Sequence, residues 1–266
     1  MTNFHLNYDI IEIISNGRNS IIYKVYNKIN NNFYACKRIT LFENNMDKIY
    51  NEINIMDILK YDNDFIKLHE YFIEIFYCYI IIELADGNIL NFLKHNMIFE
   101  NDIKEIFLQI LNSIKKLHDI NIFHLDIKLE NILYVKKEDK IKIKICDFGN
   151  SVYNYKYCTN IEIDYSPEYT SPELINNNII NDKNDIYSLG YVLYKLLMDK
   201  IIYVDIKYKN FFDYKKKHSY EFHINWNKIS NEAKDLIKQM IDNNYKLRPD
   251  INKCLNHKWF HNCNFT

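Results

Sequence analysis

Two short segments of the chain carry the residue types that transfer of a phosphoryl group requires. The first is His124-Leu125-Asp126-Ile127-Lys128-Leu129-Glu130-Asn131, and the second is Asp147-Phe148-Gly149, which begins sixteen residues after Asn131. Such chemistry needs a carboxylate to orient the attacking hydroxyl, oxygen ligands for a divalent cation and a positive charge on the phosphates. An aspartate and an asparagine lie five residues apart in the first segment, and a second aspartate from a neighbouring turn can join them. The two segments therefore indicate a phosphoryl-transfer site.

Landmarks of one family occur in order along the chain. The two segments resemble the catalytic loop and the magnesium-binding turn of eukaryotic protein kinases. The other segments that resemble this family are Tyr34-Ala35-Cys36-Lys37, Glu52, Tyr169-Thr170-Ser171-Pro172-Glu173, Asp185-Ile186-Tyr187-Ser188-Leu189-Gly190 and Arg248-Pro249. The resemblance runs from residue 8 to about residue 260, and an ordered series of this kind is much more specific than a single motif.

The resemblance implies a catalytic role for two residues and a metal-binding role for two others. Asp126 orients the substrate hydroxyl and accepts its proton, and Lys128 stabilises the phosphoryl group in transfer. Asn131 and Asp147 hold Mg²⁺ on the phosphates of ATP. Lys128, two residues after Asp126, is typical of serine/threonine-specific members, and Ser166 matches the hydroxyl residue that contacts this lysine in them. The resemblance thus implies an ATP-dependent protein serine/threonine kinase.

The same resemblance implies which residues bind ATP. Lys37 anchors the α- and β-phosphates, and Glu52 positions Lys37 through an ion pair. Apart from the family pattern, these two residues could form an ordinary surface ion pair of little energetic value. The other implied contacts with ATP come from Ile14, Ser15, Gly17, Ile22, Ala35, Glu83 and Ala85.

The sequence departs from the family pattern in two places. Ser15 and Ser20 stand where the first and third glycines of the nucleotide-binding loop usually lie, while Gly17 retains the middle one. A Cβ in this loop restricts the backbone, so we expect weaker ATP binding rather than none. Leu125 replaces the arginine that in the family pairs with a phosphate on the activation segment (residues 147–173).

The loss of that arginine bears on regulation. Leucine cannot pair with a phosphate, so we expect basal activity that does not depend on phosphorylation of the activation segment. The segment still offers hydroxyl groups, among them those of Ser151, Tyr157 and Thr159.

Two other functions fit parts of the pattern. The serines in the nucleotide-binding loop also fit a pseudokinase, which binds nucleotide or partners without transferring phosphate. A kinase for a small metabolite would share the ATP-binding residues. Ser171-Pro172-Glu173 and Arg248 disfavour the metabolite kinase, because in the protein kinases they shape a platform for protein substrates.

The spacing of apolar residues predicts the elements that position these residues. Short runs rich in Ile, Val and Tyr predict three antiparallel strands within 8–39, and two more strands fit 66–73 and 76–83. Helical spacing predicts helices over 45–60 and from about residue 100 to residue 117. The remaining predicted elements are strands near 132–134 and 141–146 and helices near 183–198, 230–242 and 249–258.

These elements and the resemblance imply an α+β, two-lobed protein kinase fold. We expect the chain to be a single kinase domain, residues 1–266. Its small, β-rich N-lobe covers 1–83, a hinge that contains Gly87 covers 84–88, and a larger helical C-lobe covers 89–266.

The composition excludes several classes of partner. With 34 basic and 35 acidic residues, the formal net charge of −1 gives no electrostatic reason to bind nucleic acid or an anionic membrane. No apolar run approaches the roughly 20 residues that a membrane span needs, and no secretory signal is apparent at the start of the chain. Six scattered cysteines without a CxxC pair indicate reduced thiols. We therefore expect an intracellular monomer, cytoplasmic or nuclear, that acts on protein substrates.

The last residues allow two interpretations. Cys254, His257, His261 and Cys263 are potential zinc ligands, but their spacing does not separate two ligand pairs by a long loop. Packing of a terminal helix is the favoured interpretation. The stretch 255–260, Leu-Asn-His-Lys-Trp-Phe, resembles the end of the calmodulin-dependent and energy-sensing kinase group.

Overall fold

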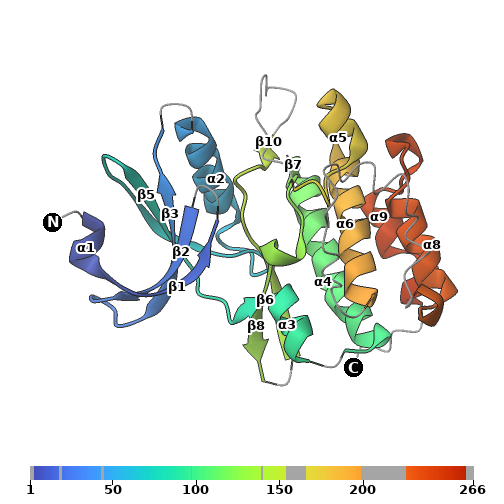
Figure 1. The fold of residues 1–266 in the computed structure, drawn as a ribbon, viewed down its shortest axis with the longest axis horizontal. Helices are drawn as coiled ribbons and strands as arrows, with labels where there is room; N and C mark the ends of the chain where they lie inside the picture. The colour runs from blue at the N-terminus through green and yellow to red at the C-terminus, as the bar shows by residue number, and fades with distance from the viewer. Residues whose placement is uncertain are drawn as a thin grey trace, which may run out of the picture. The chain divides into compact units, whose positions relative to one another are not determined.

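The computed structural model describes residues 3–17, 20–42, 45–96, 98–138, 140–153, 166–198 and 226–261 (Figure 1). The chain divides into two compact units. Unit 1 comprises Met1–Gly87 and Leu133–Gly149, and unit 2 comprises Asn88–Ile132 and Asn150–Thr266. Residues 133–149, which we expected to lie in the larger lobe, belong to unit 1, where Ile145 forms a parallel bridge with Phe65.

Unit 1 contains a five-stranded antiparallel sheet with the strand order β1-β2-β3-β5-β4. Branched and aromatic side chains recur in every strand, and such side chains favour extended backbone. The strands are β1 (Tyr8–Asn16), β2 (Ser20–Asn27), β3 (Phe33–Thr40), β4 (Leu68–Ile73) and β5 (Tyr77–Ile82). The five predicted strands are therefore confirmed.

Helices cover both faces of this sheet. On one side, α2 (Met46–Leu59) confirms the helix predicted over 45–60, and its apolar residues Ile49, Ile53 and Met56 are buried. Lys37 of β3 points towards this helix, so its neighbour Cys36 points to the opposite face. On that face the short helix α1 (Asn3–Asn7) buries Phe4 in one apolar cluster with Cys36. Helix α1 was not predicted, because five residues are too few for a helical period.

A smaller sheet leads to the segment Asp147-Phe148-Gly149. It has the strand order β6-β8-β9, with β6 (Gly87–Asn88), β8 (Ile132–Lys137) and β9 (Lys140–Ile145). Strands β8 and β9 confirm the two strands predicted near 132–134 and 141–146. The N–H of Ile145 donates to the carbonyl of Asp64 (2.9 Å), and the N–H of Ile66 donates to the carbonyl of Ile145 (3.0 Å). These bonds fix the end of β9 two residues before Asp147.

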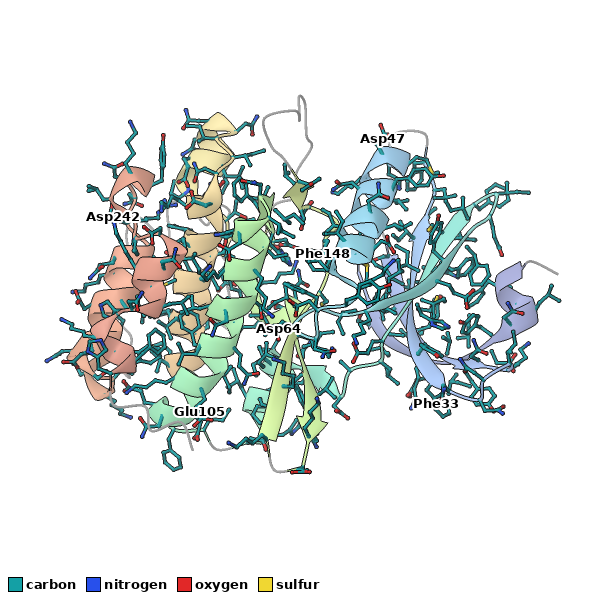
Figure 2. The ribbon with its side chains drawn as sticks, turned by 180° about the vertical axis from the view of Figure 1, so that it is seen from behind. Phe33, Asp47, Asp64, Glu105, Phe148 and Asp242 are labelled. Carbon is teal, nitrogen blue, oxygen red and sulfur yellow. The ribbon has the colours of Figure 1, made fainter. Side chains whose placement is uncertain are left out.

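Unit 2 is mainly helical. Helix α4 (Glu100–Asp119) buries the predicted apolar stripe, and α6 (Asp182–Leu197) contacts both α4 and α8 (Asn231–Met240). Figure 2 shows their side chains filling the space between these helices. The helices predicted near 183–198 and 230–242 are confirmed. The other described elements are α3 (Ile89–His95), β7 (Ile122–Phe123), β10 (Val152–Tyr153), α5 (Pro172–Asn177), α9 (Ile251–Leu255) and the 3₁₀ turns Leu129–Asn131, Trp226–Lys228, Tyr245–Leu247 and Lys258–Phe260.

The C-terminal helix is shorter than the predicted 249–258. Helix α9 begins after Asp250, whose carboxylate accepts the N–H of Lys253 (2.8 Å), and His257 caps the following 3₁₀ turn. Trp259 and Phe260 are buried, as expected of packing residues, Leu255 is only partly buried, and Cys254 is buried as well. Within the described ranges, which exclude Cys263, no group of three or more potential metal ligands is assembled.

A buried ion pair ties the end of unit 2 to its middle. The two terminal guanidinium nitrogens of Arg248, Nη1 and Nη2, donate to Glu173 over 2.7 Å and 2.8 Å, and both side chains are buried. Asn184 also donates to Glu173 (2.8 Å). Paired, bidentate geometry is needed to offset the cost of burying two charges.

Among the described helices, none is both long enough and apolar enough to cross a bilayer.

Candidate active site

Three charged residues of unit 1 meet at one point. Lys37 Nζ lies 2.5 Å from Glu52 Oε1 and 2.7 Å from Asp147 Oδ1. Lys37 comes from β3, between β2 and β5, and Glu52 comes from the buried side of α2. The side chains of Lys37 and Glu52 are only 14% and 5% exposed. This is therefore not an ordinary surface ion pair.

The electrostatics of this group keep Lys37 charged. Burial by itself lowers the pKa of Lys37, but the carboxylates of Asp147 and Glu52 outweigh it and hold the pKa above its usual value. Lys37 thus offers a fixed positive charge for an anionic ligand.

The backbone around Asp147 is adapted to this contact. Asp147 has a φ of 66°, in the left-handed region that few residues other than glycine, asparagine and aspartate adopt readily. A Cβ at Gly149 would lie 3.4 Å from Glu52 Oε2 and 3.5 Å from Asp147 Oδ1. A side chain at Gly149 would therefore lie in contact with the charged group.

The predicted nucleotide-binding loop joins β1 and β2. The N–H of Gly17 donates to the carbonyl of Ser20 (2.8 Å), and a Cβ on Gly17 would lie 3.2 Å from that oxygen. Ile14 and Ser15 are exposed at the end of β1, and Ile22 pairs with Lys37 across β2 and β3. Arg18 and Asn19 lie outside the described residues.

The other predicted ATP contacts lie on β3 and after β5. Ala35 is buried on β3, on the same face as Lys37. The side chain of Glu83 is engaged within unit 1, because its Oε2 lies 2.9 Å from Lys144 Nζ. Ala85 lies in the connector between β5 and β6.

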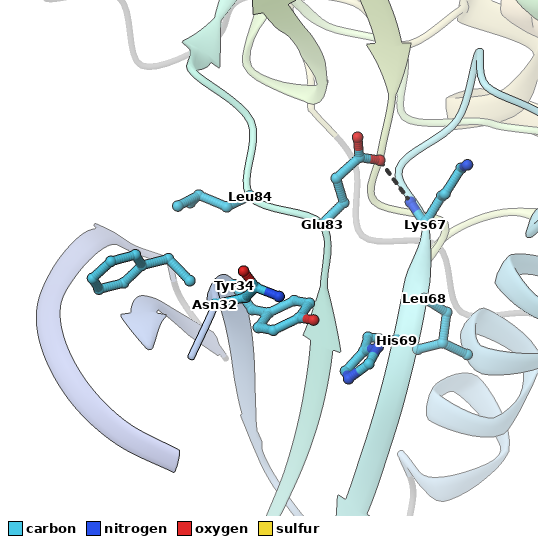
Figure 3. Close-up of a pocket in the computed structure, with 8 residues that line it drawn as sticks. Asn32, Tyr34, Lys67, Leu68, His69, Glu83 and Leu84 are labelled. Atoms are coloured by element: carbon cyan, nitrogen blue, oxygen red, sulfur yellow. Dashed lines mark hydrogen bonds between the residues drawn. The ribbon is translucent and has the colours of Figure 1, made fainter. Parts of the chain in front are cut away.

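A pocket of about 500 Å³ opens elsewhere on unit 1 (Figure 3). Its lining residues are Asn32, Phe33, Tyr34, Lys67, Leu68, His69, Glu83 and Leu84. Tyr34 precedes Ala35 on β3 and therefore points to the face opposite Lys37. Its ring stacks on His69, with 4.5 Å between the ring centroids. The pocket thus lies on the side of β3 opposite Lys37.

In unit 2, three side chains donate hydrogen bonds to the predicted catalytic carboxylate of Asp126. Lys128 Nζ (2.6 Å) and Asn131 Nδ2 (3.1 Å) donate to Asp126 Oδ2, and Ser166 Oγ donates to Asp126 Oδ1 (2.7 Å). Lys128 also donates to Ser166 Oγ (3.1 Å), which is the contact predicted from the sequence. The bond from Ser166 to Asp126 itself was not predicted.

Asp185 of α6 fixes the backbone of the residues that precede Asp126. Its buried carboxylate accepts the N–H groups of His124 (2.9 Å) and Leu125 (2.8 Å) and is bonded to His118 Nε2 (2.9 Å). Burial alone raises the pKa of Asp185, but the bonds from His118 and His124 bring it below its usual value. Both histidines thus have a structural role. This role of Asp185 was not predicted, because its partners are backbone amides, which nearly every residue type carries.

Leu125 occupies an apolar site. It has a φ of 62° and is buried with Phe123, Val152 and Leu174, and the partly buried Ile180 packs against them. Ser151 is buried, and its Oγ donates to the carbonyl of His124 (3.1 Å). It is therefore not an accessible phosphorylation site, which corrects the expectation that its hydroxyl is available. Tyr157 and Thr159 lie outside the described residues.

The comparisons with known proteins agree on one family. A family model described as "Protein kinase domain" matches residues 8–260. The chain is 32% identical over 280 aligned residues to "Probable serine/threonine-protein kinase fhkB" of Dictyostelium discoideum, an alignment that covers 95% of this chain and 23% of that protein. It is 35% identical over 223 residues to "Calcium-dependent protein kinase 5" of Plasmodium berghei (strain Anka), with 82% and 39% covered. The chain therefore spans well under half the length of these two relatives.

Proposed function

The chain belongs to the protein kinase family, with its two-lobed α+β fold and ATP as phosphoryl donor, and on that premise we propose that it phosphorylates serine and threonine hydroxyls of proteins. The observation that carries the proposal is the bonding of Asp126 to both Lys128 and Ser166. In the family this arrangement belongs to the serine/threonine type.

In the proposed reaction, Asp126 accepts the proton of the substrate hydroxyl. Its three side-chain partners fix the direction of the carboxylate, and a positioned base contributes ~10²–10⁴-fold to the rate. Lys128 places a positive charge beside this carboxylate, where negative charge builds up on the transferring group.

Lys37 would bind the phosphates of ATP. It stays charged because Glu52 and Asp147 hold its pKa high, and Glu52 keeps it in place from the buried side of α2. Ser15 and Ser20 in the nucleotide-binding loop were the reason to consider a pseudokinase. The complete set of charged residues supports transfer instead.

We propose Mg²⁺ as the accompanying cation, with Asn131 and Asp147 as its protein ligands. Both residues offer oxygen atoms, which Mg²⁺ prefers. Asn131 donates two bonds to Asp126 through Nδ2, which turns its side-chain oxygen the other way, and Asp147 has a carboxylate. The donor chemistry therefore fits the ion, which would supply positive charge to the phosphates.

Incubation with radiolabelled ATP and Mg²⁺ tests the proposal, with generic acidic and basic proteins and a panel of small alcohols offered in parallel. Label in protein serine or threonine supports it. Label only in an alcohol would indicate a metabolite kinase, and nucleotide binding without any transfer would indicate a pseudokinase.

A further inference from the structure

Lys195 lies near the catalytic loop, but the catalytic scheme gives it no role. It is on α6, seven residues after Ser188, and residues with this spacing share one face of a helix. Its Nζ lies 2.6 Å from Glu168 Oε1 and 4.6 Å from the centroid of the Tyr169 ring. The Lys195 side chain is only 19% exposed, so these two contacts hold the ammonium group in place.

The turn that carries Glu168 is bonded directly to the catalytic carboxylate. Ser166 donates to Asp126, and its carbonyl accepts the N–H of Tyr169 (2.9 Å) and of Thr170 (3.0 Å). Ser188 of α6 donates to the carbonyl of Tyr169 (3.0 Å), which attaches the turn to the helix. Under the proposed function, Asp126 marks the position of the acceptor hydroxyl. The flanking substrate residues must therefore pass close to this turn.

Two glutamates, Glu130 and Glu168, lie close to the turn, which Lys128 and Lys195 also contact. Burial raises the pKa of Tyr169, and the nearby carboxylates of Glu130 and Glu168 raise it further. Glu130 is exposed, and the Glu168 side chain is 43% exposed, so a peptide can reach both carboxylates. Lys195 offsets the charge of Glu168.

We propose that Lys195 determines charge specificity by neutralising Glu168, which disfavours a basic side chain close to the acceptor hydroxyl. The inference rests on the proposed function. A basic substrate residue must compete with Lys195 for Glu168, whereas a neutral or acidic residue does not. Partly exposed ion pairs are weak, so the effect on peptide selection is about two- to fivefold.

Paired peptides test this specificity. Each has one serine and a single Arg or Glu, moved through successive positions on either side of that serine. The readouts are peptide affinity by fluorescence anisotropy and kcat/KM, each expressed as an Arg-to-Glu preference. Lys195→Met is expected to raise this preference by about two- to fivefold at one or more positions. Lys195→Arg keeps the charge and should match the wild type.

Lys183 provides the matched control. It lies on the same helix, its side chain is also 19% exposed, and it pairs with Asp182 at 3.1 Å. Lys183→Met should leave the preference unchanged. An unchanged preference in Lys195→Met, or an equal rise in Lys183→Met, would overturn the inference, as would a wild-type protein that binds none of the peptides.

A second variant works in the opposite direction and covers the case of a misfolded Lys195→Met protein. Glu168→Gln should lower the Arg-to-Glu preference, and an unchanged or higher value contradicts the inference. Peptide affinity is measured without turnover. Binding with the expected preferences but no phosphate transfer would thus refute the proposed kinase function and leave the charge specificity standing.

Discussion

Removal of every phosphate from the activation segment (residues 147–173) should leave basal activity unchanged. In many relatives, a phosphate there pairs with the arginine beside the catalytic aspartate and orders the segment. Here Leu125 packs with Phe123, Val152 and Leu174 instead. Val152 of β10 also pairs with Phe123 of β7. These contacts hold the start of the segment whether or not a phosphate is present.

The magnitudes support this expectation. Full burial of a leucine side chain contributes about 1.5–3 kcal/mol, and Leu125 is only 4% exposed. A hydrogen bond to a charged group contributes a similar ~1.5–3 kcal/mol. The apolar cluster can therefore replace the charged contact, and it does so without a modification.

The assay compares phosphatase-treated enzyme and Thr159→Ala with untreated wild type, while mass spectrometry verifies that the segment is unmodified. All three should have the same activity within about twofold. A loss of ~10-fold or more, equivalent to about 1.4 kcal/mol of barrier, would refute the reasoning.

Leu125→Ala tests the apolar cluster itself and should lower the free energy of unfolding by ~2–5 kcal/mol. Leu247→Ala, at a leucine that is 69% exposed, is the control and should cost little.

Three further predictions concern catalysis, nucleotide binding and stability. Asp126→Asn should lower phosphate transfer by ~10²–10⁴-fold and leave nucleotide affinity nearly unchanged, and equal turnover in mutant and wild type would contradict the catalytic assignment. Ser15→Gly should tighten ATP binding or lower its KM, because loss of the Cβ frees the loop to close, and a titration that shows equal or weaker affinity refutes this. Glu173→Ala should lower the unfolding free energy in urea by ~3–5 kcal/mol because it leaves Arg248 buried without its partner, and a loss under about 1 kcal/mol would show that the pair is unimportant.

Local patterns were sufficient to predict most elements. The sheet of unit 1 follows from short runs of branched and aromatic residues, and α4 follows from an apolar stripe that is buried in the structure. The contact between Lys37 and Glu52 was predicted only through the family resemblance. Their spacing alone also fits a surface pair, and burial, which separates the two cases, depends on how α2 packs against the sheet.

The features that were not predicted depend on backbone groups or on distant packing. Asp185 holds the loop before Asp126 through amides 60 and 61 residues away, and amides are common to nearly every residue type. Ser151 was expected to be available because its hydroxyl lies in the activation segment, but the Leu125 cluster buries its surroundings. Neither the bonds of Asp185 nor the burial of Ser151 produces a regular spacing of residue types from which it could be predicted.

Helix α1 has a consequence for recombinant production of the protein. A fragment trimmed to the family-matched range would begin at Tyr8 and lose Phe4. The Phe4 ring is fully buried and stacks on Tyr79, with 4.2 Å between the ring centroids. Trimming would bare the Tyr79 ring and the apolar surface around it, and exposed apolar surface of this kind promotes aggregation. Expression should therefore retain these first residues and place any affinity tag at the other end.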